Sequence, residues 1–145
     1  DLPDVHIRGE WDARLESFLA ERIYEFNSSA TGLFDGKGLV AEIKDGAGRS
    51  IGAAAGHTWG GTCQLTYLWV DAAHRLRGLG SALLKAVESE ARRRHCRQVI
   101  LLTHDFQAPV FYERHGYRRL AEIANYPVGH SQFVYVRHLV EPEGA

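Results

Sequence analysis

The chain has 145 residues, 45% of them hydrophobic and 24% charged, which is the composition of one folded globular domain. Its 17 Lys and Arg residues nearly balance 18 Asp and Glu residues, so no overall field would gather nucleic acid or anionic lipid. Cys63 and Cys96 lack the spacing of a zinc site or of a disulfide framework. No apolar run approaches the ~20 residues of a membrane span, and no secretory leader precedes the fold. We therefore expect a single domain over residues 1–145 in the cytoplasm, with no metal and with no nucleic-acid or membrane partner.

The first half of the chain predicts a strand, a helix and three antiparallel strands. Alternation over residues 5–8 indicates the first strand. Apolar residues at helical spacing from Trp11 to Phe26 indicate an amphipathic helix, and Asn27, Ser28, Ser29 and Gly32 break this pattern. Glycine-rich turns then separate three segments that alternate or are rich in aromatic and β-branched residues. These segments, the predicted strands, cover residues 39–44, 50–59 and 64–70.

The second half predicts helices between strands. An apolar stripe from Leu79 to Ala91 indicates a long amphipathic helix, and the nearly continuous apolar run 98–103 indicates a strand buried on both faces. Because a strand, a helix and a strand in that order favour a parallel pair, we expect this strand to run parallel to the one before the helix. The remaining predicted elements are a helix over 108–114 that ends in a left-handed cap at Gly116, and strands over 117–123 and 131–139.

The most informative stretch is the loop in which Arg75, Gly78 and Gly80 form an Arg-x-x-Gly-x-Gly pattern that opens into the long helix. Successive N–H groups in such a loop form a concave nest, and the helix start adds unsatisfied donors and the positive end of its dipole. Glycine lets phosphate oxygens approach these amides without a Cβ in the way. The pattern is neither a Walker A element nor a dinucleotide fingerprint. It predicts a pyrophosphate site, with a ligand-free turn as the alternative.

Three segments resemble the GNAT superfamily of acyl-CoA-dependent N-acyltransferases: residues 68–70, the loop 75–80 with its helix, and the Ala-x-x-x-Tyr-x-x-x-Gly-Tyr stretch 108–117. The resemblance implies an α+β fold in three α/β/α layers, with a mixed, mostly antiparallel central sheet of about seven strands flanked by helices. It implies acetyl-CoA (coenzyme A) as the cofactor, with pantetheine between two splayed strands. The residues expected to contact it are Leu68, Trp69, Val70, Arg75, Leu76, Arg77, Gly78, Leu79, Gly80, Ser81, Asp105, Ala108, Phe111 and Tyr112.

The resemblance also assigns catalytic roles to Tyr112 and Leu68. The tyrosine at the position of Tyr112 commonly protonates the departing thiolate. A thiol ionises near pH 8.5 and a phenol near pH 10, so a hydrogen bond to the sulfur suffices. The alternative is that Tyr112 simply packs beside Phe111 in the core. The backbone amide of Leu68 would polarise the thioester carbonyl and stabilise the oxyanion.

Two positions depart from the family pattern. Asp105 stands where many members have an asparagine that contacts CoA, so that contact is open. Gln64 stands where protein-lysine members have a glutamate base, and an amide cannot act as a base. An alkyl amine of pKa ~10.4 is almost fully protonated at pH 7, so something else must remove its proton. The candidates are His57, His104, His130, Asp105 and Glu122, or water that relays to a backbone carbonyl; each histidine has a solvated or structural role as its alternative.

The acceptor pocket of this superfamily usually lies after the first helix and at the turn between the last two strands. Those segments, 24–27 and 125–130, are aromatic with few charges, which favours an acceptor with an apolar or aromatic part. The alternative is that these aromatics close the core. The basic segment 92–97 is expected to be a solvated helix end, in preference to a site for RNA or for the 3′-phosphate of CoA. The residues expected to contact the acceptor are Tyr24, Phe26, Asn27, Trp59, Gln64, Tyr67, Tyr126 and His130.

The sequence therefore predicts an N-acetyltransferase that moves the acetyl group of acetyl-CoA to a primary amine on a small molecule, by direct transfer in a ternary complex. Neither cysteine lies in a recognisably activated setting, which disfavours a covalent intermediate. Two alternatives stay open: a protein lysine or N-terminal acetyltransferase, and a non-catalytic acyl-CoA-binding sensor module. Homodimers are common in the superfamily, so a homodimer is a further expectation.

Overall fold

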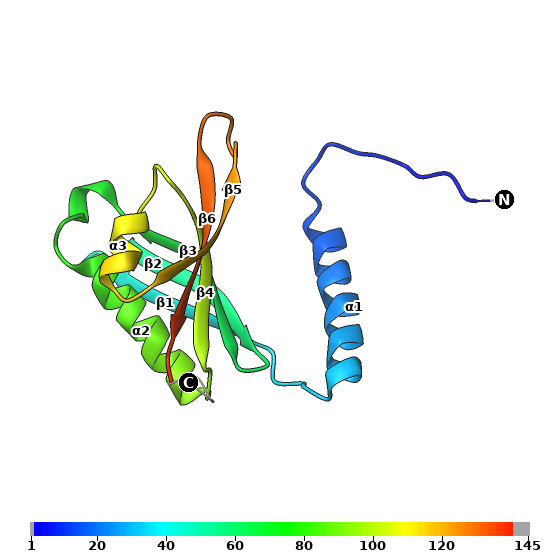
Figure 1. Cartoon of the computed structure of the whole chain (residues 1–145), viewed down its shortest axis with the longest axis horizontal. Helices are drawn as coiled ribbons and strands as arrows, with labels where there is room; N and C mark the ends of the chain where they lie inside the picture. Colours follow the sequence, from blue (N-terminus) through cyan, green and yellow to red (C-terminus); the bar gives the residue numbers. More distant parts are fainter. Residues whose placement is uncertain (1, 141–145) are drawn as a thin grey trace. The chain divides into compact units, whose positions relative to one another are not determined.

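The computed structural model describes residues 2–140 and divides into two units, one up to Phe34 and one from Asp35 (Figure 1). The expectation of a single domain over residues 1–145 stays a prediction. None of the helices in the described part of the chain combines the length and the apolarity needed to cross a bilayer.

The first unit contains one helix, α1 (Ala13–Thr31). The Asp12 carboxylate begins it by accepting the Leu15 N–H at 2.9 Å, and Gly32, with φ 74°, ends it in a left-handed cap. The predicted helix is confirmed. Of the residues predicted to break its pattern, Gly32 does end the helix, whereas Asn27, Ser28 and Ser29 do not. The chain stays helical there and the Thr31 hydroxyl donates to the Asn27 carbonyl at 2.7 Å, so the helix ends only where glycine makes the left-handed conformation inexpensive.

The strand predicted over residues 5–8 is also wrong, because residues 2–9 form neither helix nor strand. A strand is stable only when a neighbouring strand satisfies its N–H and C=O groups. The described residues of the first unit contain no strand, so residues 5–8 have no partner strand in that unit with which to form hydrogen bonds.

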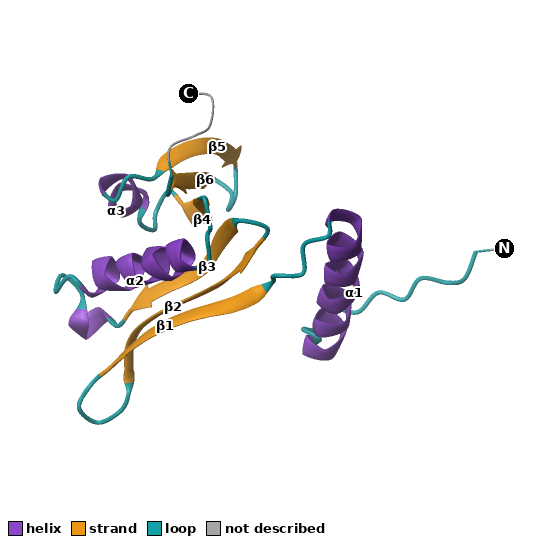
Figure 2. Cartoon of the chain, turned by 90° about the horizontal axis from the view of Figure 1, so that it is seen from below, coloured by secondary structure: helices purple, strands orange, loops and turns teal. Residues whose placement is uncertain are grey.

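The second unit is a six-stranded sheet in the order β1-β2-β3-β4-β6-β5, one strand fewer than the approximate expectation. Only β3 and β4 pair in parallel within the described sheet, as the order strand, helix, strand predicted. Helix α2 links them and covers one face of the sheet, which we call the helix face (Figure 2). The elements are β1 (Lys37–Lys44), β2 (Ser50–Trp59), β3 (Thr62–Val70), η1 (Ala72–His74), α2 (Leu79–Arg93), β4 (Gln98–His104), α3 (Pro109–Arg114), β5 (Arg118–Ala124) and β6 (Ser131–His138).

The core lies between the helix face and α2. Side chains alternate along each strand, so every second residue of β4 is buried, as are Cys63 and Leu65 on β3 before its bulge. On α2 the predicted stripe, including Leu83, Leu84 and Val87, is almost fully buried. Burying such side chains contributes about 1.5–3 kcal/mol each.

The core contains a buried carboxylate that is bound by two other side chains. Glu88 on α2 is only 3% exposed, and it accepts the Tyr117 hydroxyl at 2.8 Å and an Arg137 N–H at 2.8 Å. Burial and this bond raise the pKa of the Tyr117 phenol, so Tyr117 stays a donor. The three side chains thereby link α2 to the residue before β5 and to β6.

A β-bulge at Thr66 redirects β3. On β2 the register jumps from Ala55 opposite Tyr67 to Gly56 opposite Leu65, which leaves Thr66 as the extra residue. The β3–β4 ladder ends at the same level, at Leu65 and Leu101, although both strands continue beyond it. The two strands therefore part along their carboxyl-terminal halves.

The bulge requires glycine at position 56, which gives a stability prediction. A Cβ at Gly56 would lie 2.1 Å from the Gln64 carbonyl oxygen, a backbone atom that cannot move without breaking the bulge. We expect Gly56→Ala to lower the free energy of unfolding by about 2–3 kcal/mol. Gly38→Ala is the matched control, because a Cβ there meets no atom within 4 Å. Urea unfolding of both variants would refute this requirement if they were equally stable.

Candidate active site

The loop between β3 and α2 is held in one conformation by its own polar groups. The Asp71 carboxylate accepts the Ala73 N–H at 3.2 Å and lies 2.9 Å from Nδ1 of His74. The hydrogen bond from His74 lowers the pKa of Asp71, so this acceptor stays ionised. Arg75 donates its Nε–H to the Val70 carbonyl at 3.1 Å, which places its guanidinium beside the end of β3.

Two glycines open the start of α2, each for a different reason. Gly78 has φ 79° and is the N-cap, a conformation that glycine adopts without strain. It supplies no side-chain cap, so the first N–H groups of α2 have no side-chain acceptor there. At Gly80 a Cβ would lie 3.4 Å from the Phe111 ring, so glycine also lets α2 approach α3 closely. The sequence reasoning had not foreseen this packing role.

A cavity of about 570 Å³ lies against this loop. It combines amides of the α2 start and the Arg75 guanidinium with an apolar wall from β3 and α3. This donor set fits the diphosphate and pantetheine of an acyl-CoA. Its lining residues are Leu68, Val70, His74, Arg75, Leu76, Gly78, Leu79, Gly80, Ser81, Gln107, Ala108 and Phe111.

A second cavity of about 210 Å³ continues the first toward Tyr112. The two share Leu68, Gln107 and Ala108, so a path leads from the loop to the parted strands. Trp69 lines the second cavity, whereas Arg77 lines neither of them. The other lining residues of the second cavity are Leu65, Thr66, Tyr67, Leu101, Leu102 and Thr103.

Tyr112 belongs both to the core and to the wall of this second cavity. Its side chain is 8% exposed, and its ring lies edge-on to those of Phe111 and Tyr117 at 5.2 and 5.6 Å. Burial raises the pKa of Tyr112 to about 12. The phenol is therefore a hydrogen-bond donor at neutral pH, and complete proton transfer to a thiolate is less favourable than for an ordinary phenol.

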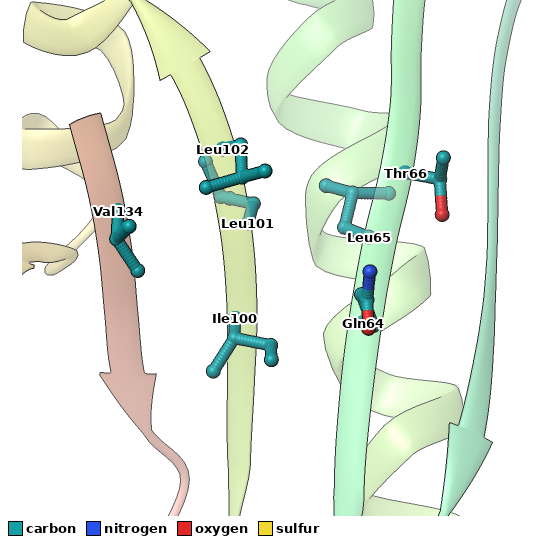
Figure 3. A pocket seen from close by; sticks show the side chains of 7 residues that line it. All are labelled: Gln64, Leu65, Thr66, Ile100, Leu101, Leu102 and Val134. Carbon is teal, nitrogen blue, oxygen red and sulfur yellow. The ribbon is translucent and has the colours of Figure 1, made fainter. Parts of the chain in front are cut away.

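A third cavity, of about 230 Å³, opens between β3 and β4 (Figure 3). Gln64, Ile100, Leu102 and Val134 line it, and on β4 both Ile100 and Leu102 alternate with the buried residues of the helix face. Within the second unit this is the face of the sheet opposite α2, which we call the open face. The second and third cavities share four residues, so the gap between the strands extends through the sheet: Leu65, Thr66, Leu101 and Leu102.

Three of the predicted base candidates come together at the end of β4. The Asp105 carboxylate accepts the Ser131 N–H at 2.9 Å and lies 3.0 Å from Nδ1 of His130. His104, the residue before it, lies 3.0 Å from the Tyr126 carbonyl through its Nδ1. Both oxygens of Asp105 thus bind the β5–β6 hairpin, and its contact with a cofactor stays a prediction.

The other two base candidates lie on β2 and β5. His57 is exposed on β2 and pairs in register with Gln64. Glu122 on β5 accepts the Ser131 hydroxyl at 2.8 Å.

Only some of the residues expected to contact the acceptor lie together in the structure. Tyr67 and Gln64 line the cavities between the strands, Tyr126 and His130 lie in the cluster after β4, and Trp59 ends β2. The contributions of the three α1 residues, Tyr24, Phe26 and Asn27, stay predictions because α1 belongs to the first unit.

Sequence reasoning missed Phe106, Gln107 and Gln132. Phe106 stacks on His104 at 5.2 Å, and Gln107 accepts the His104 N–H at 2.7 Å. Alternation along β4 and β6 could have placed His104 and Gln132 on the open face, but the ring contacts depend on the turn after β4.

The basic segment 92–97 is partly structural. Arg94 donates to the Gly38 carbonyl at 2.9 Å and to the Glu90 carboxylate at 2.8 Å, and Arg93 also binds Glu90. These bonds hold the end of α2 against β1 and account for two of the arginines without a ligand.

Known proteins resemble this chain in sequence and in fold. The profile of the acetyltransferase (GNAT) domain matches residues 35–119. Blasticidin-S acetyltransferase of Streptomyces morookaense is 41% identical over 93 residues, which cover 63% of this chain and 68% of that protein. An acetyltransferase of Agrobacterium fabrum is 28% identical over 120 residues, or 83% of this chain and 88% of that protein. The crystal structure of an acetyltransferase from Bacillus cereus has 28% identity and a TM-score of 0.78, over 93% of this chain and 98% of that one.

The matched region spans more than half of the chain and includes the loop, the parted strands and α3. The six-stranded mixed sheet with its helices is the α+β fold of these structures. Use of an acyl-CoA follows from the family. On these grounds the chain belongs to the GNAT family and is an acetyltransferase.

Proposed function

We propose that this acetyltransferase uses acetyl-CoA and transfers the acetyl group to a primary amine of a small molecule, by direct transfer in a ternary complex. The observation that carries the proposal is the gap between β3 and β4, which is lined from both faces of the sheet. One side leads to the glycine loop and the other leads to the open face. Two substrates can then meet without sharing a path.

The residues on the helix face suit an acyl-CoA, which supplies an activated thioester when it is bound. The amides at the start of α2 and the Arg75 guanidinium would hold the diphosphate. Leu68 would donate its amide to the thioester carbonyl, and Tyr112 would donate a hydrogen bond to the sulfur. Holding both reactants in the gap would supply several kcal/mol of the rate enhancement.

The open face favours a small acceptor over a protein. The cavity there is about 230 Å³, and no acidic side chain is among its lining residues in the described part of the chain. A protein lysine acetyltransferase would be expected to offer an acidic, open groove instead. The relative from Streptomyces morookaense is named for acetylation of blasticidin S, which supports an acceptor of that size class.

Acetyl transfer to amines tests the function directly. We expect release of CoA from acetyl-CoA in the presence of blasticidin S or another amine of a small-molecule panel, with the N-acetyl product identified by mass spectrometry. Transfer to peptide lysines or peptide N-termini, but to no small amine, would replace the proposed acceptor class. Tight binding of acetyl-CoA without turnover on any amine would indicate a sensor module.

Tyr112→Phe tests the role of the phenol. Since general acid catalysis contributes about 10²–10⁴-fold, we expect kcat to fall by about 100-fold while the affinity for CoA stays unchanged. Tyr117→Phe is the matched control, because Tyr117 is equally buried but its hydroxyl binds Glu88. The control should lower thermal stability and leave kcat of the folded protein unchanged; an equal loss of kcat in both variants would leave Tyr112 with a packing role only.

Direct transfer needs no cysteine nucleophile, so we expect both cysteines to be unreactive toward alkylating reagents in the folded protein. Cys63 and Cys96 are almost fully buried, and burial raises the pKa of Cys63 to about 11 and also raises that of Cys96. A raised pKa leaves almost no thiolate at pH 7.5, so neither thiol can serve as a nucleophile. We expect iodoacetamide to leave both unmodified and the activity intact until the protein is unfolded. Fast alkylation of the native protein with loss of acetyl transfer would favour a covalent route.

A further inference from the structure

His104 lies on the open face beside the third cavity. It ends β4, where Ile100 and Leu102 line that cavity and the intervening residues are buried on the helix face. Because strand side chains alternate, His104 follows Leu102 on the open face, about 7 Å further along the strand. In register it pairs with Gln132 of β6, two positions beyond the pair of Leu102 and Val134 and therefore on the same face. His104 therefore lies on the face that carries the cavity, as the next same-face residue of β4 after Leu102, which lines it.

His104 and Leu68 both lie beyond the last β3–β4 pair, which joins Leu65 and Leu101. Leu68 and His104 each belong to the stretch of strand that continues after the two strands have parted. The bulge at Thr66 shifts the register of β3, so no residue-for-residue pairing extends across the gap. His104 is thus at the same end of the gap as the amide that would polarise the thioester carbonyl.

Hydrogen bonds fix the tautomer of His104. A carbonyl oxygen can only accept, so the Tyr126 carbonyl, 3.0 Å from Nδ1, requires a proton on that nitrogen. In the neutral imidazole Nε2 then carries a lone pair. Among the described residues its hydrogen-bond partner is the Gln132 side-chain amide at 3.5 Å, a long and therefore weak contact. Nε2 is therefore able to accept a proton from a substrate.

The ring and the backbone of His104 are both held in place. Phe106 stacks on the imidazole at 5.2 Å with an interplanar angle of 6°, and the Tyr126 ring meets it edge-on at 5.0 Å. The backbone N–H donates to the Gln107 side chain at 2.7 Å, and its carbonyl accepts the Gln107 N–H at 3.0 Å. Such preorganisation is what a general base needs.

We propose that His104 is the general base that takes a proton from the acceptor amine through Nε2. This proposal rests on the proposed function. An alkylammonium and a thioester give an amide, a thiol and one proton: the C–N bond forms, the C–S bond breaks, and of the two protons lost by nitrogen one ends on sulfur. His104 takes the other and returns it to solvent. Gln64 cannot take this proton, because an amide has no basic site.

Other titratable groups near His104 are already engaged. Asp105 and His130 bind each other at 3.0 Å, and Phe106 lies edge-on to His130 at 5.1 Å, between the two imidazoles. Glu122 binds the Ser131 hydroxyl, and the remaining titratable group is the phenol of Tyr126. Among the described groups of the cluster, none forms an ion pair with the His104 ring.

Nitrogen NMR of the histidines tests the placement without any acceptor. In the free protein we expect the resonances of His104 to show the neutral Nδ1–H form with Nε2 unprotonated, assigned by their loss in His104→Gln. Addition of CoA should leave this tautomer in place. A proton on Nε2 in the neutral ring would overturn the proposal, whether or not the protein proves to acetylate any amine.

The pH dependence of turnover tests the role itself, with an amine that the wild type acetylates. We expect His104→Gln to lower kcat/KM by about 100-fold at pH 7 and to change the shape of the pH profile, so that kcat/KM rises continuously toward the pKa of the amine. Affinity for CoA, measured by calorimetry, should be unchanged. His138→Gln, at the far end of β6, is the control and should retain the wild-type profile.

His130→Gln is the rival variant in the same experiment. If His130→Gln changes the pH profile of kcat/KM in this way and His104→Gln keeps the wild-type profile, His130 with Asp105 is the base and the proposal is wrong. If no amine is acetylated by the wild type, the proposed function fails, while the tautomer of His104 still decides whether its Nε2 is placed to accept a proton.

Discussion

The parting of β3 from β4 after Leu65 and Leu101 is the constraint on which the rest of the second unit depends. It follows from one extra residue, Thr66, and from the missing side chain of Gly56 opposite it. Beyond that level the outer edges of both strands stay paired, β3 with β2 and β4 with β6, so only their facing edges lose partners. A ligand that offers amide groups of its own could restore the lost hydrogen bonds, which is why the gap suits a pantetheine arm.

The sequence was a good guide wherever a local rule decides the structure. The stripe on α2, the glycine turns and the buried run of β4 predicted their elements to within a few residues. The parallel pairing of β3 and β4 followed from the order of the elements. Local rules failed at residues 5–8, where alternation is meaningless without a partner strand, and at residues 27–29, where polar side chains were compatible with an existing helix.

The cofactor side of the site was more predictable than the acceptor side. The loop from Arg75 to Gly80 is contiguous in sequence, and the left-handed φ of 79° at Gly78 is one that glycine signals directly, although the φ of 64° at Leu76 is not. The cluster around His104 joins β4, the turn after it and the β5–β6 hairpin, so no spacing in the sequence could reveal it. Five base candidates were therefore equivalent in the sequence, whereas hydrogen bonds in the fold distinguish them.

Asp105 joins the β5–β6 turn to the end of β4. Its two carboxylate oxygens fasten His130 and the start of β6 to the end of β4, so the β5–β6 turn is anchored to a strand of the central sheet. If the acceptor binds against this turn, as we expect, substitutions within residues 125–129 would change which molecule fits. The glycine loop and the parted strands, which would hold the donor, would not need to change with them.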